Sequence, residues 1–234
     1  MVEIKSFGSS SAGNCYQIID GSSSLLLEAG INPKKLNVDF STVDALLVTH
    51  EHGDHAKYID AILKRSALSV YCTAGTAQFI DAPSYRVMTI KAKEAFTVKG
   101  WQIMPFEVEH DAAEPVGYLI QTPSGKKVLF ATDTYYIRYK FSGITHFMVE
   151  CNYSLDKVDE LLEAGKIDRN RRNRLVTSHF EINNVLQFFR EQDKSAVEEI
   201  WLLHLSDSNS DARLFKEKVQ AATGAPVYVA GGVS

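Results

Sequence analysis

The segment VTHEHGDH, residues 48–55, places three of the chain's seven histidines and one aspartate within six positions. It overlaps the end of the apolar run DALLVTH (44–50), which has the composition of a buried β-strand, and Gly53 permits a tight turn after it. Imidazole nitrogens and carboxylate oxygens are the ligands that zinc and similar divalent ions prefer. The segment therefore predicts a metal site in the turn that follows a strand.

The composition of the whole chain is typical of one α/β domain. With 234 residues and 45% hydrophobic content, the chain is long enough to bury a sizeable core, and we expect a single domain over residues 1–234. A net charge of −4 argues against a broadly basic nucleic-acid binder, so a polyanion would have to be held locally. No apolar run approaches the ~20 residues that span a bilayer, so no membrane partner is expected.

The cysteines indicate a reducing compartment. Cys15, Cys72 and Cys151 are odd in number and widely spaced, which argues against a disulfide framework or a cysteine zinc site. We expect all three to be buried apolar fillers. The N-terminal stretch MVEIKSFGSS carries no apolar signal core. These features predict a cytoplasmic protein.

The order of patterns along the chain favours strands first and helices last. Short β-type runs dominate up to about residue 151, and helical patterns cover 154–165, 181–192 and 211–224. In the second of these, Ile182, Val185, Leu186 and Phe189 share one helical face, which should be buried. Two sheets that face each other, with helices outside, are the simplest layered arrangement for such a chain.

A second group of ligand-type residues lies at the ends of other predicted strands. His110 follows IMPFEVE, Asp133 follows KKVLFAT, and His204 lies within IWLLHL. His50, His52 and His110 are expected to hold one ion, and a second ion beside it is expected to be held by Asp54, His55 and His204, with Asp133 between the two. His146 begins a strand instead of ending one, and we interpret it as structural.

Here the sequence resembles a known family. HEHGDH is similar to the H-x-H-x-D-H signature of the metallo-β-lactamase fold, and His110, Asp133 and His204 match its later metal motifs in order. The resemblance covers most of the chain and implies an α/β, four-layer αββα sandwich with two divalent metal ions, Zn²⁺ first and Mn²⁺ as the alternative. Glu28 stands where the superfamily usually has aspartate. His52 replaces the glutamate of the iron-binding redox branch, which favours a hydrolase.

Four shorter stretches narrow the resemblance to the YycJ-like (WalJ) exonuclease branch. They are GSSSAGNCY (8–16), HDAAEPVGYLI (110–120), FATDT (130–134) and VECNY (149–153). The resemblance implies a phosphodiesterase that degrades DNA from the 5′ end, with DNA favoured over RNA as substrate. In the expected mechanism, a hydroxide that bridges the two metals attacks phosphorus, and Asp54 both binds metal and orients that hydroxide.

Two segments are candidates for holding the substrate. The first is the Gly/Ser-rich turn near the N-terminus, where Ser9, Ser10, Ser11 and Asn14 offer donors to phosphate oxygens, although the turn could equally be only a flexible hairpin. The second is the basic run 166–174. Its Arg171 and Arg172 could grip a nucleic-acid backbone, although a charge run is often only a solvated face.

His179 is the candidate for a second catalytic role beside Asp54. The pattern Ser178-x-x-Glu181 fits a capping box, which predicts His179 in the first turn of a helix, where anions are favoured. By resemblance to related phosphodiesterases, His179 would contact the scissile phosphate or protonate the leaving oxygen. The alternative is a surface histidine of the capping turn.

One further cluster and two rival functions remain open. Tyr135, Tyr136, Tyr139 and Phe141 follow Asp133 and are either packing residues or a platform on which one ring stacks on a nucleotide. A small-molecule metallohydrolase acting on a cyclic nucleotide, thioester or lactone would use the same ligands. A nucleic-acid-binding protein with a residual metal site is the third alternative.

Overall fold

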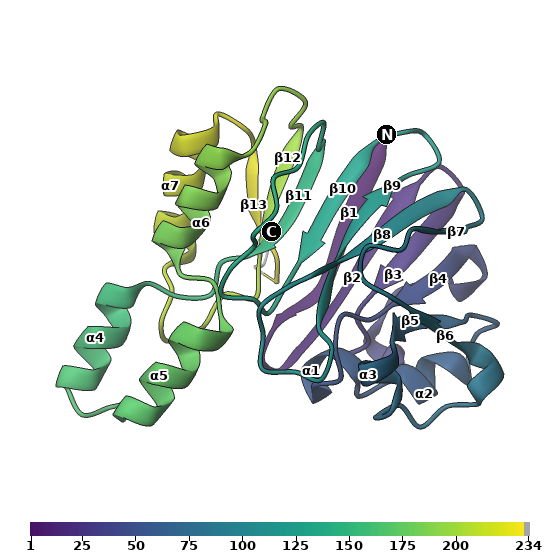
Figure 1. Cartoon of the computed structure of the whole chain (residues 1–234), viewed down its shortest axis with the longest axis horizontal. Coiled ribbons are helices and arrows are strands. Elements are labelled where there is room, and N and C mark those ends of the chain that lie inside the picture. The colour runs from purple at the N-terminus through teal and green to yellow at the C-terminus, as the bar shows by residue number, and fades with distance from the viewer. Residues whose placement is uncertain (232–234) are drawn as a thin grey trace. The chain divides into compact units, whose positions relative to one another are not determined.

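A computed structural model describes residues 1–231 of the chain, which divides into two compact units (Figure 1). Unit 1 comprises Met1–Glu107 and Ala112–Lys127. Unit 2 comprises Val108–Asp111 and the chain from Val128 onward. Each unit combines strands with helices, as expected for the α/β class.

The first sheet of unit 1 is mixed. β1, β2 and β3 pair antiparallel, and β3 to β6 continue in parallel, in the spatial order β1-β2-β3-β4-β5-β6. The parallel strands are almost continuously apolar because both of their faces are covered. The strands are β1 (Val2–Ser10), β2 (Gly13–Asp20), β3 (Ser23–Leu27), β4 (Val43–Leu47), β5 (Val70–Thr73) and β6 (Val87–Ile90).

Short helices pack on this sheet and close its core. Ile59 and Ile62 of α2 are buried in one cluster with Leu46 of β4 and Val70 of β5. This apolar contact anchors the segment that follows the histidine-rich turn, because α1 and α2 come directly after it. The helices are α1 (Gly53–Ala56), α2 (Ile59–Leu63) and α3 (Ala74–Ala77), with 3₁₀ turns at Pro33–Lys35, Phe40–Thr42 and Ser84–Arg86.

Three antiparallel strands complete unit 1: β7 (Phe96–Val98), β8 (Trp101–Glu107) and β9 (Val116–Gln121). Two buried side chains tie them to β4. The Trp101 indole donates to Asp44 Oδ2 at 3.0 Å, and the Tyr118 hydroxyl donates to the Val48 carbonyl at 2.7 Å. The second bond fixes the backbone two residues before His50.

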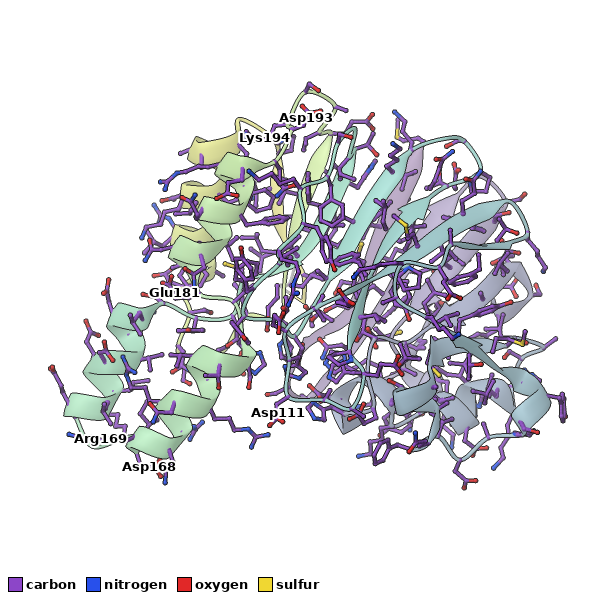
Figure 2. All side chains as sticks on the ribbon, viewed as in Figure 1. Asp111, Asp168, Arg169, Glu181, Asp193 and Lys194 are labelled. Atoms are coloured by element: carbon purple, nitrogen blue, oxygen red, sulfur yellow. The ribbon has the colours of Figure 1, made fainter. Side chains whose placement is uncertain are left out.

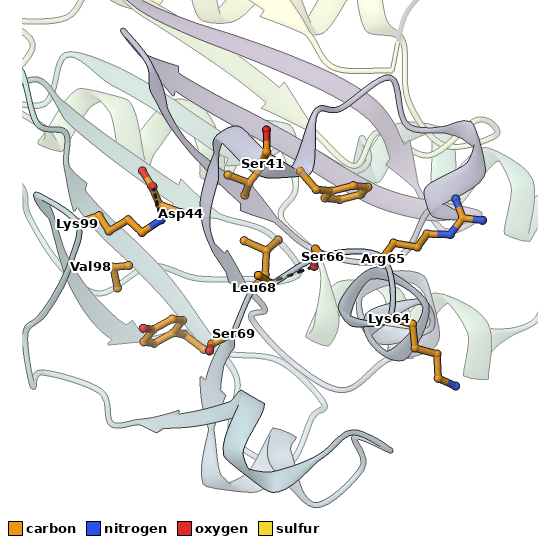
Figure 3. A pocket seen from close by; sticks show the side chains of 13 residues that line it. Ser41, Asp44, Lys64, Arg65, Ser66, Leu68, Ser69, Val98 and Lys99 are labelled. Atoms are coloured by element: carbon orange, nitrogen blue, oxygen red, sulfur yellow. Dashed lines mark hydrogen bonds and ion pairs between the residues drawn. The ribbon is translucent and has the colours of Figure 1, made fainter.

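A pocket of ≈ 810 Å³ lies at the opposite end of β4 from the histidines (Figure 3). Its lining includes Val43 and Ser69, at the N-terminal ends of β4 and β5, whereas His50 follows the C-terminal end of β4. The Lys99 ammonium pairs with Asp44 at this pocket at 3.3 Å. The pocket is therefore separate from the candidate ligands of unit 1.

Unit 2 is built on four parallel strands in the order β13-β12-β11-β10. In β11 every residue is buried, which is typical of a central parallel strand. Because the strands are parallel, their C-terminal ends meet at one edge, and ligand-type residues gather there. The strands are β10 (Lys127–Ala131), β11 (His146–Glu150), β12 (Glu199–Leu203) and β13 (Val227–Val229).

Four helices accompany these strands: α4 (Leu155–Glu163), α5 (Arg169–Ser178), α6 (Ile182–Glu191) and α7 (Ala212–Thr223). α4 and α5 contact one another, as do α6 and α7 (Figure 1). The apolar face of α6 is buried as predicted at Ile182, Val185 and Phe189. However, Phe188 is buried in place of Leu186, because its ring meets Phe147 and Phe180.

One helix of unit 2 was not expected from the sequence. The basic run 166–174, for which no helix was predicted, forms most of α5, with Asp168 as its N-cap accepting a bond from the Arg171 amide. The cysteines lie in both units. Cys15, Cys72 and Cys151 are free and buried, which confirms that part of the prediction. Among the helices described, none is long and apolar enough to cross a membrane.

Candidate metal centre

The unit 1 cluster consists of His50 and His52, from the turn between β4 and α1, and of Asp54 and His55, from α1 itself. The ring centroids of His50 and His52 are 4.7 Å apart, and those of His50 and His55 are 4.2 Å apart. His55 Nε2 lies 3.4 Å from Asp54 Oδ2. His50 and His55 are buried, so three imidazoles and a carboxylate share a small, largely dry volume. Such a donor set suits a divalent ion.

Hydrogen bonds from neighbouring strands orient these side chains. The Thr49 hydroxyl bonds His50 Nδ1 at 2.9 Å, and the Asn14 amide contacts His55 Nε2 at 3.0 Å. Asn14 also reaches Asp54 Oδ2 at 3.4 Å. Bonds of this kind, from residues behind the ligands, set ring orientation in metal sites.

Glu28 lies behind the same turn. Its carboxylate is fully buried, lies 3.5 Å from His55 Nδ1 and accepts from the Thr49 amide at 3.3 Å. Burial raises the pKa of Glu28, against the effect of His55 and Thr49. Next along the chain, a Cβ at Gly30 would meet the Asp54 carbonyl oxygen at 1.7 Å. This close approach requires glycine, and it joins the end of β3 to the histidine-rich turn.

The loop that carries the HDAAEP motif also braces unit 1. The Ala113 amide donates to Glu51 Oε1 at 2.7 Å, within the histidine-rich turn. Glu114 accepts from the Gly75 amide at 2.7 Å, and a Cβ on Gly75 would meet the Glu114 Cβ at 2.6 Å. The residues of the motif that follow Asp111 therefore stabilise the conformation of the histidine-rich turn.

The unit 2 cluster consists of His110, Asp133, Glu150, His179 and His204. Four of these, Asp133, Glu150, His179 and His204, offer ligand atoms that all lie within 4.8 Å of one another. Glu150 ends β11, His204 directly follows β12, and Asp133 comes two residues after β10. The parallel register of these strands therefore gathers the donors.

Glu150 is the residue that the sequence interpretation missed. Its Oε1 lies 2.7 Å from His179 Nδ1 and 3.0 Å from His204 Nδ1, while its Oε2 accepts from the amides of Thr134 at 2.8 Å and Phe180 at 3.2 Å. One buried carboxylate thus orients two histidines. The rule that identified Asp133 and His204, a polar residue at the end of an apolar strand, also applies to Glu150 in HFMVEC.

His110 and Asp133 are held by local contacts. His110 Nδ1 bonds the Ser178 carbonyl at 3.0 Å, and its Nε2 lies 3.7 Å from Asp133 Oδ2. Asp133 and His204 both have positive φ, 47° and 54°. Residues other than glycine seldom adopt this backbone conformation, and they do so mostly where a functional site imposes it.

The pKa values of His110 and His179 are shifted in opposite directions. Burial lowers the pKa of His110 below its ordinary value, although Asp133 and Glu150 oppose that shift. Burial acts in the same direction on His179, but the Glu150 carboxylate outweighs it and raises the pKa of His179. The same pairing lowers the pKa of Glu150 despite its burial. The Glu150 carboxylate therefore favours the protonated form of His179, whereas burial disfavours the protonated form of His110.

The position of His179 corrects one prediction. Ser178 is the last residue of α5 and His179 is its C-cap, with extended backbone (φ −133°, ψ 157°), while Glu181 caps α6 through its own carboxylate. The capping-box interpretation, which put His179 in the first turn of a helix, was wrong. The acidic residue itself serves as the N-cap, so no helix N-terminus begins at Ser178. His179 is oriented by Glu150 and not by a helix N-terminus.

The predicted substrate contacts lie in different surroundings. Ser9 bonds the Tyr16 hydroxyl at 2.7 Å and is buried, and Ser10 accepts from the Ala12 amide. Ser11 is exposed at the β1–β2 turn. Asn14 braces the unit 1 cluster, as described above. On α5, Arg171 is exposed, whereas Arg172 pairs with Asp159 of α4 at 2.6 Å.

Comparison with known proteins identifies the family. Residues 18–204 match the model of the Beta-lactamase superfamily domain. Exodeoxyribonuclease YycJ of Bacillus anthracis is 25% identical over 229 residues, which cover 90% of this chain and 85% of that protein. Exodeoxyribonuclease WalJ of Streptococcus pneumoniae is 24% identical over 222 residues, which cover 86% of this chain and 81% of that protein.

The fold has a close counterpart among solved structures. The metallo-β-lactamase fold protein YhfI from Bacillus subtilis aligns with a TM-score of 0.76 at 17% identity, over 100% of this chain and 97% of that one. The predicted α/β class and fold are thereby confirmed. Both units also present the histidine and carboxylate donors that divalent ions require. The chain therefore belongs to the β-lactamase superfamily, as a metal-dependent hydrolase of the metallo-β-lactamase fold.

Proposed function

We propose that the protein is a two-metal phosphodiesterase that degrades DNA from its 5′ end. The observation that carries the proposal is the Glu150–His179 pair, at 2.7 Å, inside the same cluster as Asp133 and His204. A histidine oriented by a buried carboxylate can hold a proton at its other ring nitrogen. Such a group assists the expulsion of an alkoxide from a phosphodiester, because it can protonate the leaving oxygen. The exodeoxyribonuclease relatives, which match most of the chain, agree with this chemistry.

The metal ligands proposed are the seven expected from the sequence. His50, His52 and His110 would hold one ion, and Asp54, His55 and His204 the other, with Asp133 shared. Zn²⁺ suits this nitrogen-rich set best, and Mn²⁺ is the alternative. When bound, two such ions supply activation of water and neutralisation of charge on the phosphate.

The roles of the side chains follow from their contacts. His179 Nδ1 faces Glu150, so its Nε2 is the nitrogen that would donate a proton to the leaving 3′ oxygen. Its side chain is 20% exposed, and Glu150 is fully buried, so only the histidine can reach a substrate. Asp54, with a side chain 22% exposed, is the carboxylate placed to orient the attacking water.

The substrate strand would be held by the turn after β1 and by one face of α5. Arg171, Arg174 and Ser178 lie at i, i+3 and i+7, so they share a helical face that leads to the carbonyl bonded by His110. Arg172 lies on another face, bound to Asp159, so its contribution should be smaller than predicted. Ser11 is the exposed hydroxyl of the β1–β2 turn.

The choice of DNA over RNA and the 5′ polarity rest on the exodeoxyribonuclease relatives and on the four motifs quoted from the sequence. The organisation as one domain over residues 1–234 also remains a prediction. A cytoplasmic location belongs to the same proposal, because three free cysteines are compatible with a reducing compartment.

The test uses protein loaded with Zn²⁺ or Mn²⁺ and DNA labelled at the 5′ or the 3′ end, single- and double-stranded, with matched RNA. We expect early release of the 5′ label as a short product, progressive shortening of the 3′-labelled strand, and no activity after chelation. Hydrolysis of a cyclic nucleotide, thioester or lactone with every DNA end intact would overturn the proposal in favour of a small-molecule hydrolase.

A further inference from the structure

Unit 2 contains a concave surface between α6 and the segment that follows Asp133. It is a pocket of ≈ 220 Å³, and its aromatic lining is formed by Tyr135, Tyr136, Tyr139, Phe180 and Phe188. We call it the tyrosine pocket. One wall is the segment that follows Asp133, and the other is the segment that follows His179 and leads into α6.

Both walls are attached to the same carboxylate. The amides of Thr134 and Phe180 donate to Glu150 Oε2 at 2.8 Å and 3.2 Å, and Glu150 Oε1 contacts His179. Tyr135 is two residues from Asp133, and Phe180 is the neighbour of His179. The two walls of the tyrosine pocket are therefore continuous in sequence with Asp133 and His179.

The rings at the rim are exposed, whereas those at the base are not. Tyr135 is 37% exposed and Tyr136 is 54% exposed, but Phe180 is 1% exposed and Phe188 is 6% exposed. Side chains that serve only packing would be covered like the two phenylalanines. A rim of open aromatic faces over a closed aromatic floor is suited to a flat, apolar ligand.

The pocket is firmly built and carries polar groups at its edge. Gln192 is buried and bonds both the Phe141 amide, at 2.8 Å, and the Tyr139 carbonyl, at 3.4 Å, which fixes the tyrosine segment against α6. Asn184 and Gln187 are exposed and stand at i, i+3 on α6, where they line the pocket. Side-chain amides of this kind bond the edges of nucleobases.

We propose that the tyrosine pocket binds a nucleobase of the substrate strand near its 5′ end. The proposal rests on the proposed function, because it takes the ligand to be a nucleic-acid strand. Stacking on the tyrosines holds any base, since every base has an aromatic face, so the pocket adds affinity without strict sequence preference. It positions the strand and takes no part in proton transfer.

The first test changes the substrate and leaves the protein intact. A DNA strand whose residues near the 5′ end lack bases is compared with the normal strand, using metal-loaded wild-type protein. Loss of one stacked base should lower kcat/KM by roughly 5- to 150-fold. Equal kcat/KM on both strands would overturn the proposal that the tyrosine pocket binds a base, while the exonuclease proposal would remain in place.

The second test combines that substrate with variants. On normal DNA, the kcat/KM of Tyr136→Ala should be as low as that of wild type on the base-free strand. On the base-free strand, Tyr136→Ala and wild type should have nearly the same kcat/KM. The bonds between Tyr136 and Thr134 use the backbone of Tyr136, so the alanine variant keeps them. Tyr136→Phe retains the ring and should recover most of the loss. Tyr85→Ala removes a tyrosine that is 78% exposed in unit 1, and it should match wild type.

A binding measurement separates failure of the pocket from failure of the proposed function. A phosphorothioate oligonucleotide with 2-aminopurine near its 5′ end is titrated with each metal-loaded protein. Quenching by wild type and Tyr85→Ala that is lost in Tyr136→Ala supports the pocket, even if no DNA is hydrolysed. Equal quenching by all three proteins would overturn the pocket proposal, and so would the absence of quenching by a wild-type protein that hydrolyses DNA. Absence of both quenching and hydrolysis would overturn the proposed function as well.

Discussion

The unit 1 cluster and the unit 2 cluster contain similar side chains but are built differently. In unit 1, His50, His52, Asp54 and His55 all come from one contiguous segment, the turn after β4 and the short helix α1. In unit 2, the donors come from separate segments, and three of them stand at the ends of parallel strands. Ligands from one contiguous segment stay close together in space whatever the register of the sheet. A dispersed set exists only when the sheet is formed in the correct register.

The support behind the clusters differs in the same way. Unit 1 uses several partners, including Asn14, Glu28 and Thr49, each of which contacts one or two members. Unit 2 relies on Glu150, which contacts His179 and His204 and also accepts two backbone amides. Damage to unit 1 should therefore be local, whereas loss of Glu150 should affect several functions together.

The largest expected effect is that of Asp54→Asn. The variant keeps the size of the side chain and should keep the fold, but it loses a metal-binding, water-orienting charge, so turnover should fall on the order of 100- to 1000-fold or below detection. DNA hydrolysis and thermal unfolding are measured together. Asp60→Asn in α2, where the carboxylate pairs with exposed Lys64, is the matched control. Near-normal turnover by metal-replete Asp54→Asn would contradict the assigned role.

His179→Ala tests a member of unit 2 that is proposed to carry protons instead of metal. Turnover should fall on the order of 100-fold while the bound metal content stays at the wild-type value. Metal analysis beside the nuclease assay checks both parts. His146→Ala, at the opposite end of β11 from Glu150, should not lower turnover in the folded protein. Loss of metal from His179→Ala would reassign the histidine to the ligands.

Glu150→Gln tests the idea of a single support in unit 2. The variant keeps an acceptor for the backbone amides but removes the charge that orients both histidines, so metal affinity and turnover should each fall by roughly 10- to 100-fold. Metal titration and kcat are the measurements.

The control for this experiment is Glu181→Gln. Glu181 is also buried, but it caps α6 through bonds to the amides of Asn183 and Asn184, so its loss should cost about 1 kcal/mol of stability and leave metal affinity unchanged. If both variants lose metal affinity equally, Glu150 has no special role.

The smallest expected effect concerns α5. Arg171→Ala combined with Arg174→Ala should weaken DNA binding uniformly across sequences and reduce the slope of log affinity against log salt by about 1 to 2. The pair Arg169→Ala and Arg172→Ala should do less. Arg169 stands beside Asp168 at the end of α5 far from Glu181, and Arg172 is bound to Asp159 (Figure 2). If both double variants and wild type have the same salt slope, the basic run 166–174 is only a solvated face and does not contact DNA.

Several features were determined by the sequence alone. The segment at residues 48–55 can be recognised from the sequence, because neighbouring positions supply both the metal-ligand side chains and the glycine that the backbone needs. The strand ends at Asp133 and His204 were also foreseeable, because a polar residue after an apolar run has few structural uses. The three C-terminal helices followed from their 3.6-residue periodicity, since burial of one face dictates the pattern.

Only the tertiary structure decided the remaining features. Glu150 gains its importance from His179, 29 positions away, and His204, 54 positions away, a proximity that depends on the parallel register of β11 and β12. α5 has no apolar stripe to reveal it, and its helix forms through the Asp168 cap and the contact of Arg172 with α4. Phe188 is buried instead of Leu186 because Phe147 and Phe180 meet it there. In each case at least one deciding partner, namely His204, Asp159 or Phe147, lies outside the local sequence pattern, which therefore carries no information about it.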